Sequence, residues 1–324
     1  MERLVSIIVP VYNVESYVKE CLDSLINQTY QNLDIIIIDN DSHDLSGTIC
    51  REYAEIDKRI HYTVQQNKGV SLARNTGLKL AKGDYVCFCD ADDTYELNYV
   101  ENMVQIKEKT KADLVICGYS KAIGDVKKVE SKIKVSQFVN QEFLVEHIFL
   151  NNNIGGYVWN KIFDTKLLDG VYFDESYQIC EDMDFVFHYL CNCKKIYVTT
   201  QSLYNYRMRN GSAVNDIDNL FDEDNQLKYA IVPENILKLN ILTEQSKECV
   251  KCGIYMSCVS ALCDYKIQNG RNSDIIVKLK FKIRQYQKIF LRSKKVGIKK
   301  KLIVTLNQYC NVRRLKKLFC YCNR

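Results

Sequence analysis

Leu33-Asp34-Ile35-Ile36-Ile37-Ile38-Asp39 is the stretch of this sequence that decides its fold class. The run is too short and too uniformly apolar for anything but a strand with neighbours on both of its faces. Such a strand belongs in the centre of a sheet that helices cover on both sides. The stretch therefore indicates an α/β domain.

Strand and helix patterns alternate around this central strand. Upstream, Val5–Tyr12 is typical of a buried strand, and apolar residues at helical spacing follow it up to Ile26. The downstream prediction is a helix at 48–56, a strand at 60–64, a helix at 69–81, a strand ending at Asp90, a helix at 97–109 and a strand at 112–119. This alternation predicts right-handed crossovers and a mainly parallel central sheet flanked by helices.

The rest of the chain predicts a change of architecture. We expect a hairpin around Gly124-Asp125, a helix near 141–150 and another helix that opens at Glu181-Asp182. Beyond about Asn219 the pattern is typical of long helices. We therefore expect an α/β domain at 1–218 and a C-terminal helical extension at 219–324.

Composition is typical of a large folded chain in a reducing compartment. The 324 residues are 47% apolar, which is enough for one large α/β domain with an appendage. The 15 cysteines are scattered and no signal peptide opens the sequence, so we expect most of them to be core thiols. Cys249 and Cys252 form a CxxC pair, but a zinc site lacks its second pair of ligands.

The C-terminal segment is strongly basic. Arg292–Arg324 holds eleven Lys or Arg and no Asp or Glu, and apolar residues are interleaved with these cations. This pattern favours an interfacial amphipathic helix on an anionic membrane surface, with a solvated basic helix as the alternative. No apolar run approaches the ~18 residues of a membrane-spanning helix. We expect a cytoplasmic protein, peripheral at the inner face of the cell membrane, and no nucleic-acid partner because no base-reading motif is present.

Asp90-Ala91-Asp92-Asp93 places three carboxylates directly after a strand. Carboxylates this close repel one another unless a positive group lies among them, and hard oxygen ligands suit Mg²⁺ or Mn²⁺. The alternative is that the acids cap the helix that begins near Leu97.

Polar residues follow three of the predicted strands, at Tyr12-Asn13, Asp39-Asn40-Asp41 and Asp90–Asp93. In open α/β sheets, ligands bind beyond the carboxyl ends of the strands, so these residues are expected along one ligand-binding edge. The Gly-rich turn of dinucleotide dehydrogenases and the Gly-Lys-Ser/Thr of P-loop enzymes are both missing.

Five ordered motifs carry a resemblance to a known family. They are Val5-Ser-Ile-Ile-Val-Pro-Val-Tyr-Asn13, Ile38-Asp-Asn-Asp-Ser42, Asn67-Lys-Gly-Val-Ser-Leu-Ala-Arg-Asn-Thr-Gly77, Asp90-Ala-Asp-Asp93 and Glu181-Asp182. Together they resemble family 2 inverting glycosyltransferases of the glycosyltransferase-A fold, as known from bacterial surface-polysaccharide enzymes. The resemblance covers about the first two-thirds of the chain.

The resemblance implies a nucleotide-diphosphate-sugar donor. Asp39 is expected to accept a hydrogen bond from the imide N–H of a uracil-type base. A divalent cation, Mn²⁺ or Mg²⁺, is expected on Asp92 and Asp90. The residues expected at the nucleotide are Pro10, Tyr12, Asn13, Asp39, Asp41, Lys68, Gly69, Arg74, Asp90, Ala91, Arg207 and Arg209. The alternatives are turn capping for Asp39, a plain turn and helix face for Lys68, Gly69 and Arg74, and a surface turn for the last two arginines.

The resemblance also assigns the catalytic and acceptor residues. Asp182 is the expected base and Glu181 its supporting neighbour, the alternative being two acids that favour a helix N-terminus. Trp159, Asn160 and Lys161 are expected at the acceptor, with the tryptophan stacked on a sugar face. A buried core tryptophan is the alternative.

The resulting prediction is a metal-dependent inverting glycosyltransferase that moves a sugar to a hydroxyl of a glycan or lipid-linked acceptor. Two other functions stay open, a sugar-phosphate nucleotidyltransferase and a non-catalytic nucleotide-sugar-binding module. The first is disfavoured because the Gly-rich, basic loop that holds a triphosphate is missing. Homo-oligomer formation through the helical extension is also open, although its periodicity is not a sustained heptad.

Overall fold

The computed structural model describes residues 2–66, 69–123, 126–130, 133–151, 154–208, 221–222, 227–267 and 273–309. The chain forms two compact units. The sheet unit comprises Met1–Asn140 and Gly156–Arg209, and the helical unit comprises Gln141–Gly155 and Asn210–Arg324. The boundary expected between 218 and 219 lies outside the described residues and stays a prediction.

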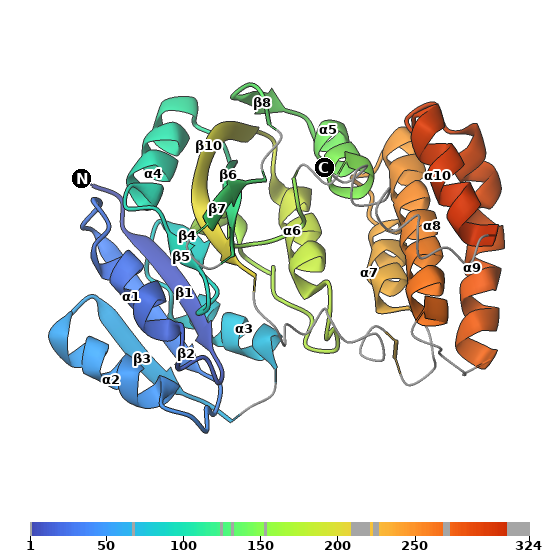
Figure 1. Ribbon diagram of the computed structural model, residues 1–324. Coiled ribbons are helices and arrows are strands. Elements are labelled where there is room, and N and C mark those ends of the chain that lie inside the picture. The colour runs from blue at the N-terminus through green and yellow to red at the C-terminus, as the bar shows by residue number, and fades with distance from the viewer. Residues whose placement is uncertain are drawn as a thin grey trace. The chain divides into compact units, whose positions relative to one another are not determined.

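Four parallel strands form one half of the sheet (Figure 1). They are β1 (Val5–Val11), β2 (Leu33–Asp39), β3 (Ile60–Val64) and β4 (Tyr85–Phe88), in the order β3-β2-β1-β4. Every residue of β2 is buried, as its uniform apolar run predicts. The register pairs Val11 with Asp39, so the carboxyl ends of β1 and β2 meet at one edge.

Helices cover both faces of this half. One face buries residues of α1 (Val18–Ile26), α2 (Ser46–Ile56) and α4 (Tyr99–Thr110) in a common core with alternate residues of β1 and β2. On the other face, α3 (Val70–Leu80) approaches β1 so closely that a Cβ on Gly77 would lie 2.4 Å from Ile8 Cγ2. The expected α/β sheet flanked by helices is confirmed.

The second half of the sheet is mixed. β9 (Lys161–Asp164) lies between β4 and β6 (Leu114–Ile123) and is antiparallel to both. β10 (Ile196–Arg207) pairs parallel with β6, and β5 (Thr94–Tyr95) and β8 (Gln137–Val139) pair antiparallel with β10. The sequence did not predict β5, β8, β9 or β10. The first three are very short, and the register of β10 against β6 shifts around Ser202.

The remaining elements of the sheet unit match the sequence more closely. β6 pairs with β7 (Val126–Val129) in the expected hairpin, whose turn residues Gly124 and Asp125 lie outside the described part of the chain. A short 3-10 helix at Thr165–Leu167 follows β9, and α6 (Glu181–Asn192) begins at the predicted acidic pair. Cys180 precedes α6 in the left-handed region, at φ 66°.

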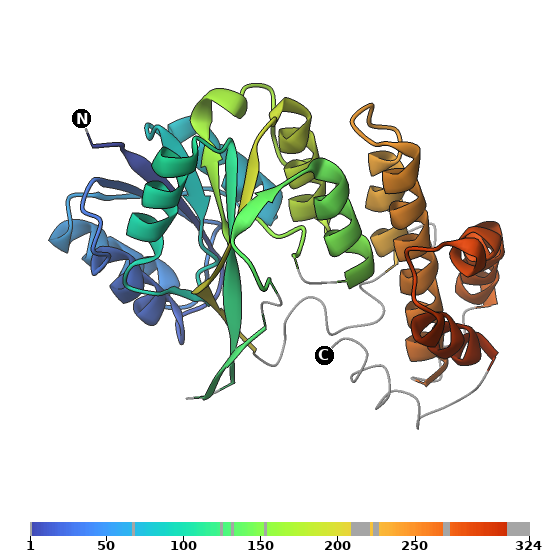
Figure 2. The same ribbon diagram turned by 90° about the horizontal axis from the view of Figure 1, so that it is seen from above.

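The helical unit is organised around α8 (Glu244–Ile267), which contacts α7 (Lys228–Ile236), α9 (Ser273–Arg292) and α10 (Ile298–Tyr309) (Figure 2). The expected long C-terminal helices are therefore present. α5 (Gln141–Glu146) and the π-helix His147–Asn151 also pack on α8, although they precede it by about a hundred residues. The sequence did not predict that this segment belongs to the helical unit.

Cysteines serve mainly as core residues. The structure describes twelve of them as free thiols, and nine of these are buried. Cys249 and Cys252 are both fully buried on α8, as expected for apolar core positions. Among the described helices, none combines the length and apolar composition needed to cross a bilayer.

Candidate functional site

The carboxyl edge of the parallel strands gathers the polar residues that follow β1, β2 and β4. Tyr12 is 44% exposed, and Asn13 adopts a left-handed conformation with φ 48°. The Asn13 Oδ1 atom accepts a hydrogen bond from the His43 backbone N–H at 2.9 Å. The loops after β1 and β2 are thus joined. Pro10 lies within β1, paired with Ile38, and Asp41 is exposed in the loop after β2.

Asp39 is buried at the end of β2 with its carboxylate engaged by the protein itself. The Tyr62 hydroxyl donates to Oδ2 at 2.7 Å, and the Ser42 backbone N–H donates to Oδ1 at 3.0 Å. A Cβ on Gly47 would come within 2.5 Å of Oδ2, so only glycine fits there. The turn-capping alternative is therefore present, and contact with a base stays a prediction.

Arg74 lies at the centre of the acidic cluster. Its side chain is 5% exposed and reaches from α3 toward the first turn of α6. Nη1 donates to Glu181 Oε1 at 2.9 Å and to Asp182 Oδ1 at 2.6 Å, while Nη2 donates to Asp90 Oδ1 at 2.9 Å. One guanidinium thus holds carboxylates that are about a hundred positions apart in the sequence. Arg74 was expected at the diphosphate. In this structure it contacts these acids, and contact with a diphosphate stays a prediction.

The cluster is electrostatically unusual because three acids share one cation in a poorly solvated place. Burial raises the pKa of Asp182 to about 7, and Glu181 and Asp90 add to the rise while Arg74 opposes it. A single guanidinium neutralises only one of the three negative charges, so the remaining charge favours protonation. A carboxylate with a pKa raised in this direction accepts a proton more readily near neutral pH, and the role of Asp182 as the base stays a prediction.

Asp93, in the turn after β4, has a structural role. Asp93 is 1% exposed, and its carboxylate accepts from the Tyr204 hydroxyl at 2.6 Å and from the Arg207 backbone N–H at 2.7 Å. Burial, with Asp90 and Asp92 adding to it, raises the pKa of Asp93 well above its usual range. Asp93 therefore links the turn after β4 to β10.

Arg207 ties β10 to the same turn. Its Nε donates to the backbone oxygen of Asp92 at 3.0 Å, its Nη2 pairs with Glu20 on α1, and its guanidinium lies over the Tyr17 ring at 5.3 Å. Arg207 was expected at the phosphate of the nucleotide, and in this structure it lies beside the carboxylate turn. Contact with a phosphate stays a prediction.

The expected cation site consists of two carboxylates, and cation binding stays a prediction. Asp90 and Asp92 offer carboxylate oxygens from one turn, and Asp90 uses only Oδ1 on Arg74. Among the described residues, no group of three or more His, Cys, Asp or Glu is placed to hold a metal ion. Proteins commonly bind Mg²⁺ through two carboxylates, and substrate phosphates supply other ligands.

The expected acceptor segment is buried. Trp159 is 3% exposed, and its ring stacks on Tyr157 and Tyr204 with centroids 4.7 and 4.3 Å away. Asn160 Nδ2 donates to the Cys117 carbonyl at 2.8 Å, and Lys161 Nζ donates to Asn160 Oδ1 at 2.9 Å. The alternative of a buried core tryptophan is what the structure shows. Direct contact of these three residues with an acceptor stays a prediction that this burial does not favour.

This buried segment nevertheless adjoins the expected base. The Val158 backbone N–H donates to Asp182 Oδ2 at 3.4 Å, so the two oxygens of this carboxylate have different partners. Burial lowers the pKa of Lys161 to about 7, while Asp182 opposes that change. The segment before β9 therefore helps to orient the Asp182 carboxylate through the Val158 backbone N–H.

Some residues of the site are not predicted by the sequence motifs. Tyr204 and Tyr62 hold Asp93 and Asp39, and neither belongs to a quoted motif. Ser71 Oγ and Arg74 Nε are buried polar atoms that make no hydrogen bond within the described residues, and they lie one turn apart on α3. Only the position of Ser71 inside the third motif hinted at a role. Of the other expected residues, Gly69 has φ 88° and Ala91 is buried, whereas Lys68 and Arg209 lie outside the described residues.

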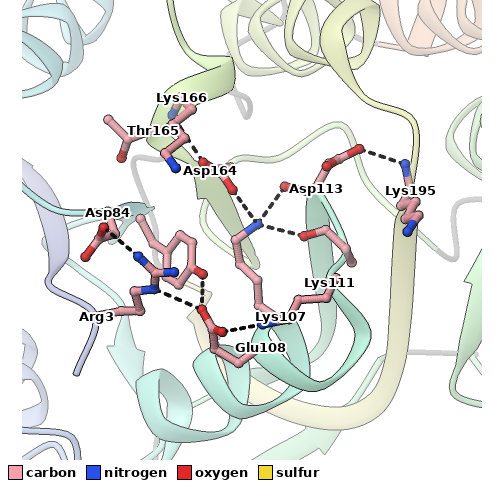
Figure 3. Close-up of polar contacts among 12 residues, drawn as sticks. Arg3, Asp84, Lys107, Glu108, Lys111, Asp113, Asp164, Thr165, Lys166 and Lys195 are labelled. Carbon is pink, nitrogen blue, oxygen red and sulfur yellow. Dashed lines mark hydrogen bonds and ion pairs between the residues drawn. The ribbon is translucent and has the colours of Figure 1, made fainter. Parts of the chain in front are cut away.

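A second polar cluster lies at the opposite edge of the sheet, where β4 and β6 begin (Figure 3). The buried Lys107 Nζ donates to the carbonyls of Ala112 and Asp113 at 2.8 and 3.0 Å and lies 3.5 Å from Asp164. Arg3 pairs nearby with Glu108 at 3.1 Å. These groups satisfy one another, so this cluster holds strand ends together.

Comparison with known proteins agrees with the fold and the motifs. The family described as "Glycosyl transferase family 2" matches residues 6–172, which is more than half of the chain. The chain therefore belongs to glycosyl transferase family 2.

The sequence identity between this chain and individual relatives is low. The chain is 29% identical to the glycosyltransferase GlyA of Streptococcus pneumoniae serotype 4 over 99% of its own length and 46% of GlyA. It is 33% identical to the minor teichoic acid biosynthesis protein GgaB of Bacillus subtilis over 63% of its length and 23% of GgaB. The chain thus spans less than half of either relative. S. aureus TarS 1-349, solved in complex with UDP-GlcNAc, shares the fold with a TM-score of 0.65 at 18% identity, covering 88% of this chain and 92% of that one.

Proposed function

We propose that the protein transfers a sugar from a UDP-sugar to a hydroxyl of a glycan or lipid-linked acceptor, with inversion at the anomeric carbon. The observation that carries the proposal is the convergence of Asp90, Glu181 and Asp182 on Arg74 at the ligand-binding edge of the sheet. The UDP-GlcNAc complex of TarS, a protein of the same fold, supports the choice of donor class.

Asp182 has the chemical role of general base in this proposal. The acceptor oxygen attacks the anomeric carbon from the face opposite the diphosphate, the bond to the diphosphate oxygen breaks, and the hydroxyl proton passes to the Asp182 carboxylate. Arg74 holds that carboxylate in place through its 2.6 Å contact, and Glu181 shares the same guanidinium. Catalysis depends on this orientation because the attacking hydroxyl must be aligned before the proton moves.

Asp90 and Asp92 are the proposed holders of a divalent cation. When bound, Mn²⁺ or Mg²⁺ supplies charge neutralisation at the departing nucleoside diphosphate. The protein's own contribution is to fix the turn, through Tyr204 and Arg207 on Asp93. In the same proposal, Pro10, Tyr12 and Asn13 border the nucleotide.

The acceptor belongs to a surface polymer in this proposal, because the similar protein GgaB is described as acting in minor teichoic acid biosynthesis. A peripheral location at the inner face of the cell membrane would bring the enzyme to lipid-linked acceptors. The basic segment expected to make that contact, Arg292–Arg324, is described only as far as Tyr309.

A donor screen tests the proposed reaction. The full chain is incubated with Mn²⁺ and a panel of UDP- and GDP-sugars, and the free UDP or GDP that accumulates is measured. We expect UDP release with at least one UDP-sugar and tighter UDP binding when Mn²⁺ is present. Failure of UDP and of every UDP-sugar to bind with Mn²⁺ would contradict the proposal, and pyrophosphate release from nucleoside triphosphates would favour the nucleotidyltransferase.

A further inference from the structure

One face of α9 is fully explained by the fold of the helical unit. The residues buried along it recur at helical spacing and are Ile275, Leu279, Ile283, Tyr286 and Phe290. The Phe290 ring stacks on Tyr255 of α8 with centroids 4.4 Å apart, and Tyr286 donates a hydrogen bond to Glu234 of α7 at 2.9 Å. This face accounts for the packing of α9 within its unit.

The opposite face of α9 carries a second apolar stripe. Val277 is 62% exposed, Phe281 66% and Leu291 43%. At 3.6 residues per turn these three side chains point away from the buried face, in the same sector as four cations. The outer face of α9 comprises Val277, Lys280, Phe281, Arg284, Lys288, Leu291 and Arg292.

The cations of this outer face have no acidic partner among the described residues. α9 holds six Lys or Arg and one acid, Asp274. Asp274 pairs with Lys278, and Lys282 pairs with Glu234, so the acids nearby are used by cations at the margin of the face. Lys280, Arg284, Lys288 and Arg292 are therefore available to an external anion.

α10 repeats the pattern directly after α9. Ile298 is 78% exposed, Leu302 60% and Leu306 49%, at a spacing of four residues that places them on one side of the helix. Lys299 and Lys301 flank this stripe, and α10 has no acidic residue. Two successive helices thus present large apolar side chains framed by cations.

We propose that the outer face of α9 docks on an anionic phospholipid surface. Exposed apolar side chains on a basic helix enter the boundary between headgroups and acyl chains, and Lys and Arg meet the lipid phosphates. A second copy of this chain is the poorer occupant, because two such faces carry the same charge and repel. The inference concerns binding alone and does not depend on the proposed sugar transfer.

Vesicle flotation of the full chain tests this surface. We expect binding to vesicles of phosphatidylcholine with 30% phosphatidylglycerol, no binding to phosphatidylcholine alone, and weaker binding as salt rises. Equal binding to both vesicle types would contradict the proposal. So would preferential capture by a single-stranded nucleic acid, which would assign the cations to another partner.

A matched pair of double variants separates the outer face from general surface hydrophobicity. Val277→Ser with Phe281→Ser should lower vesicle binding about tenfold or more, because two large apolar side chains no longer enter the interface. Ile56→Ser with Val64→Ser removes exposed apolar residues of the sheet unit, 76% and 57% exposed, and should leave binding unchanged. Both variants keep residues 310–324, so a basic C-terminus cannot explain a difference.

Circular dichroism checks that both variants fold, and light scattering checks their association state. Unchanged vesicle binding by the Val277/Phe281 variant would overturn the assignment of the docking face. Conversion of a dimer to a monomer by this variant would identify a second copy of the chain as the occupant instead.

Discussion

Arg74 is the residue on which the arrangement of the site depends. It is nearly buried, and it binds one carboxylate from the turn after β4 and two from the first turn of α6. A guanidinium presents several donors in a fixed plane, so it sets the mutual orientation of the three acids as well as their charge balance. A lysine offers the charge without this geometry.

Replacing Arg74 should destabilise the fold strongly. In Arg74→Ala three poorly solvated carboxylates lose their common cation, and we expect a loss of about 3–5 kcal/mol in urea unfolding at pH 8. Arg74→Lys should recover part of this loss. The matched control is Lys79→Ala on the exposed side of the same helix, which should change stability by less than about 0.5 kcal/mol. Equal effects of the two alanine variants would refute the central role of the guanidinium.

Removing the proposed base should separate binding from turnover. Asp182→Asn keeps the size and one acceptor oxygen of the side chain but cannot take a proton. We expect UDP affinity within a few-fold of the wild type and a kcat lower by about 10²–10⁴-fold. Calorimetry with UDP and Mn²⁺ and assays of sugar transfer provide the two readouts. Unchanged turnover would show that another group is the base.

The pH dependence of transfer should follow the raised pKa of Asp182, which is about 7. Below that pH the carboxyl group is protonated and cannot act as a base, so kcat/KM should rise about tenfold per pH unit and level off above pH 7. Glu181→Gln removes a negative neighbour that raises this pKa, so the inflection should move to lower pH. An inflection that stays in place would exclude Asp182 as the titrating group.

At the scale of elements, close packing of α3 on β1 positions Arg74. Helix α3 has Gly77 against Ile8, and no larger residue fits between the helix and the strand. The helix therefore lies close to the sheet, and its buried face presents Arg74 toward the strand ends. Similarly, the length of β10 brings Tyr204 and Arg207 back to the turn after β4.

Gly77→Ala should destabilise the protein although alanine is the better helix former. The new methyl group would meet Ile8 Cγ2 at 2.4 Å, and we expect a net loss of about 1–3 kcal/mol in urea unfolding. Gly297→Ala is the control, because no atom lies within 4 Å of its added Cβ. A neutral or stabilising Gly77→Ala would show that α3 moves away from β1 at little cost.

At the scale of the whole molecule, the division into two units does not follow the chain. Gln141–Gly155 leaves the sheet unit and joins helices that come about a hundred residues later. Phe149 packs against Gly253, and Lys295 pairs with Glu146 at 2.8 Å. The helical unit thus needs both segments of the chain.

Truncation after Met208 should therefore fail to give a well-behaved sheet unit. Without α8, apolar residues such as Leu144, Ile148 and Phe149 lose their partners, and we expect aggregation in size-exclusion chromatography. Replacing 141–155 by a short Gly/Ser linker in the truncated chain should restore a monodisperse species. If the truncation alone is monomeric and stable, the two segments do not depend on each other.

The sequence by itself determined the α/β class, the parallel strands β1–β4, the acidic turn and the start of α6, because these depend on local apolar periodicity and short polar motifs. It could not determine the partners of Arg74, which lie 16 to 108 positions away in the sequence and contact it only once the sheet has formed. Nor could it decide between a surface and a core position for Trp159, whose tyrosine neighbours include Tyr204 on a distant strand. Only the tertiary structure decided these points, because side chains compete for partners that the folded sheet, and not the local pattern, brings within reach.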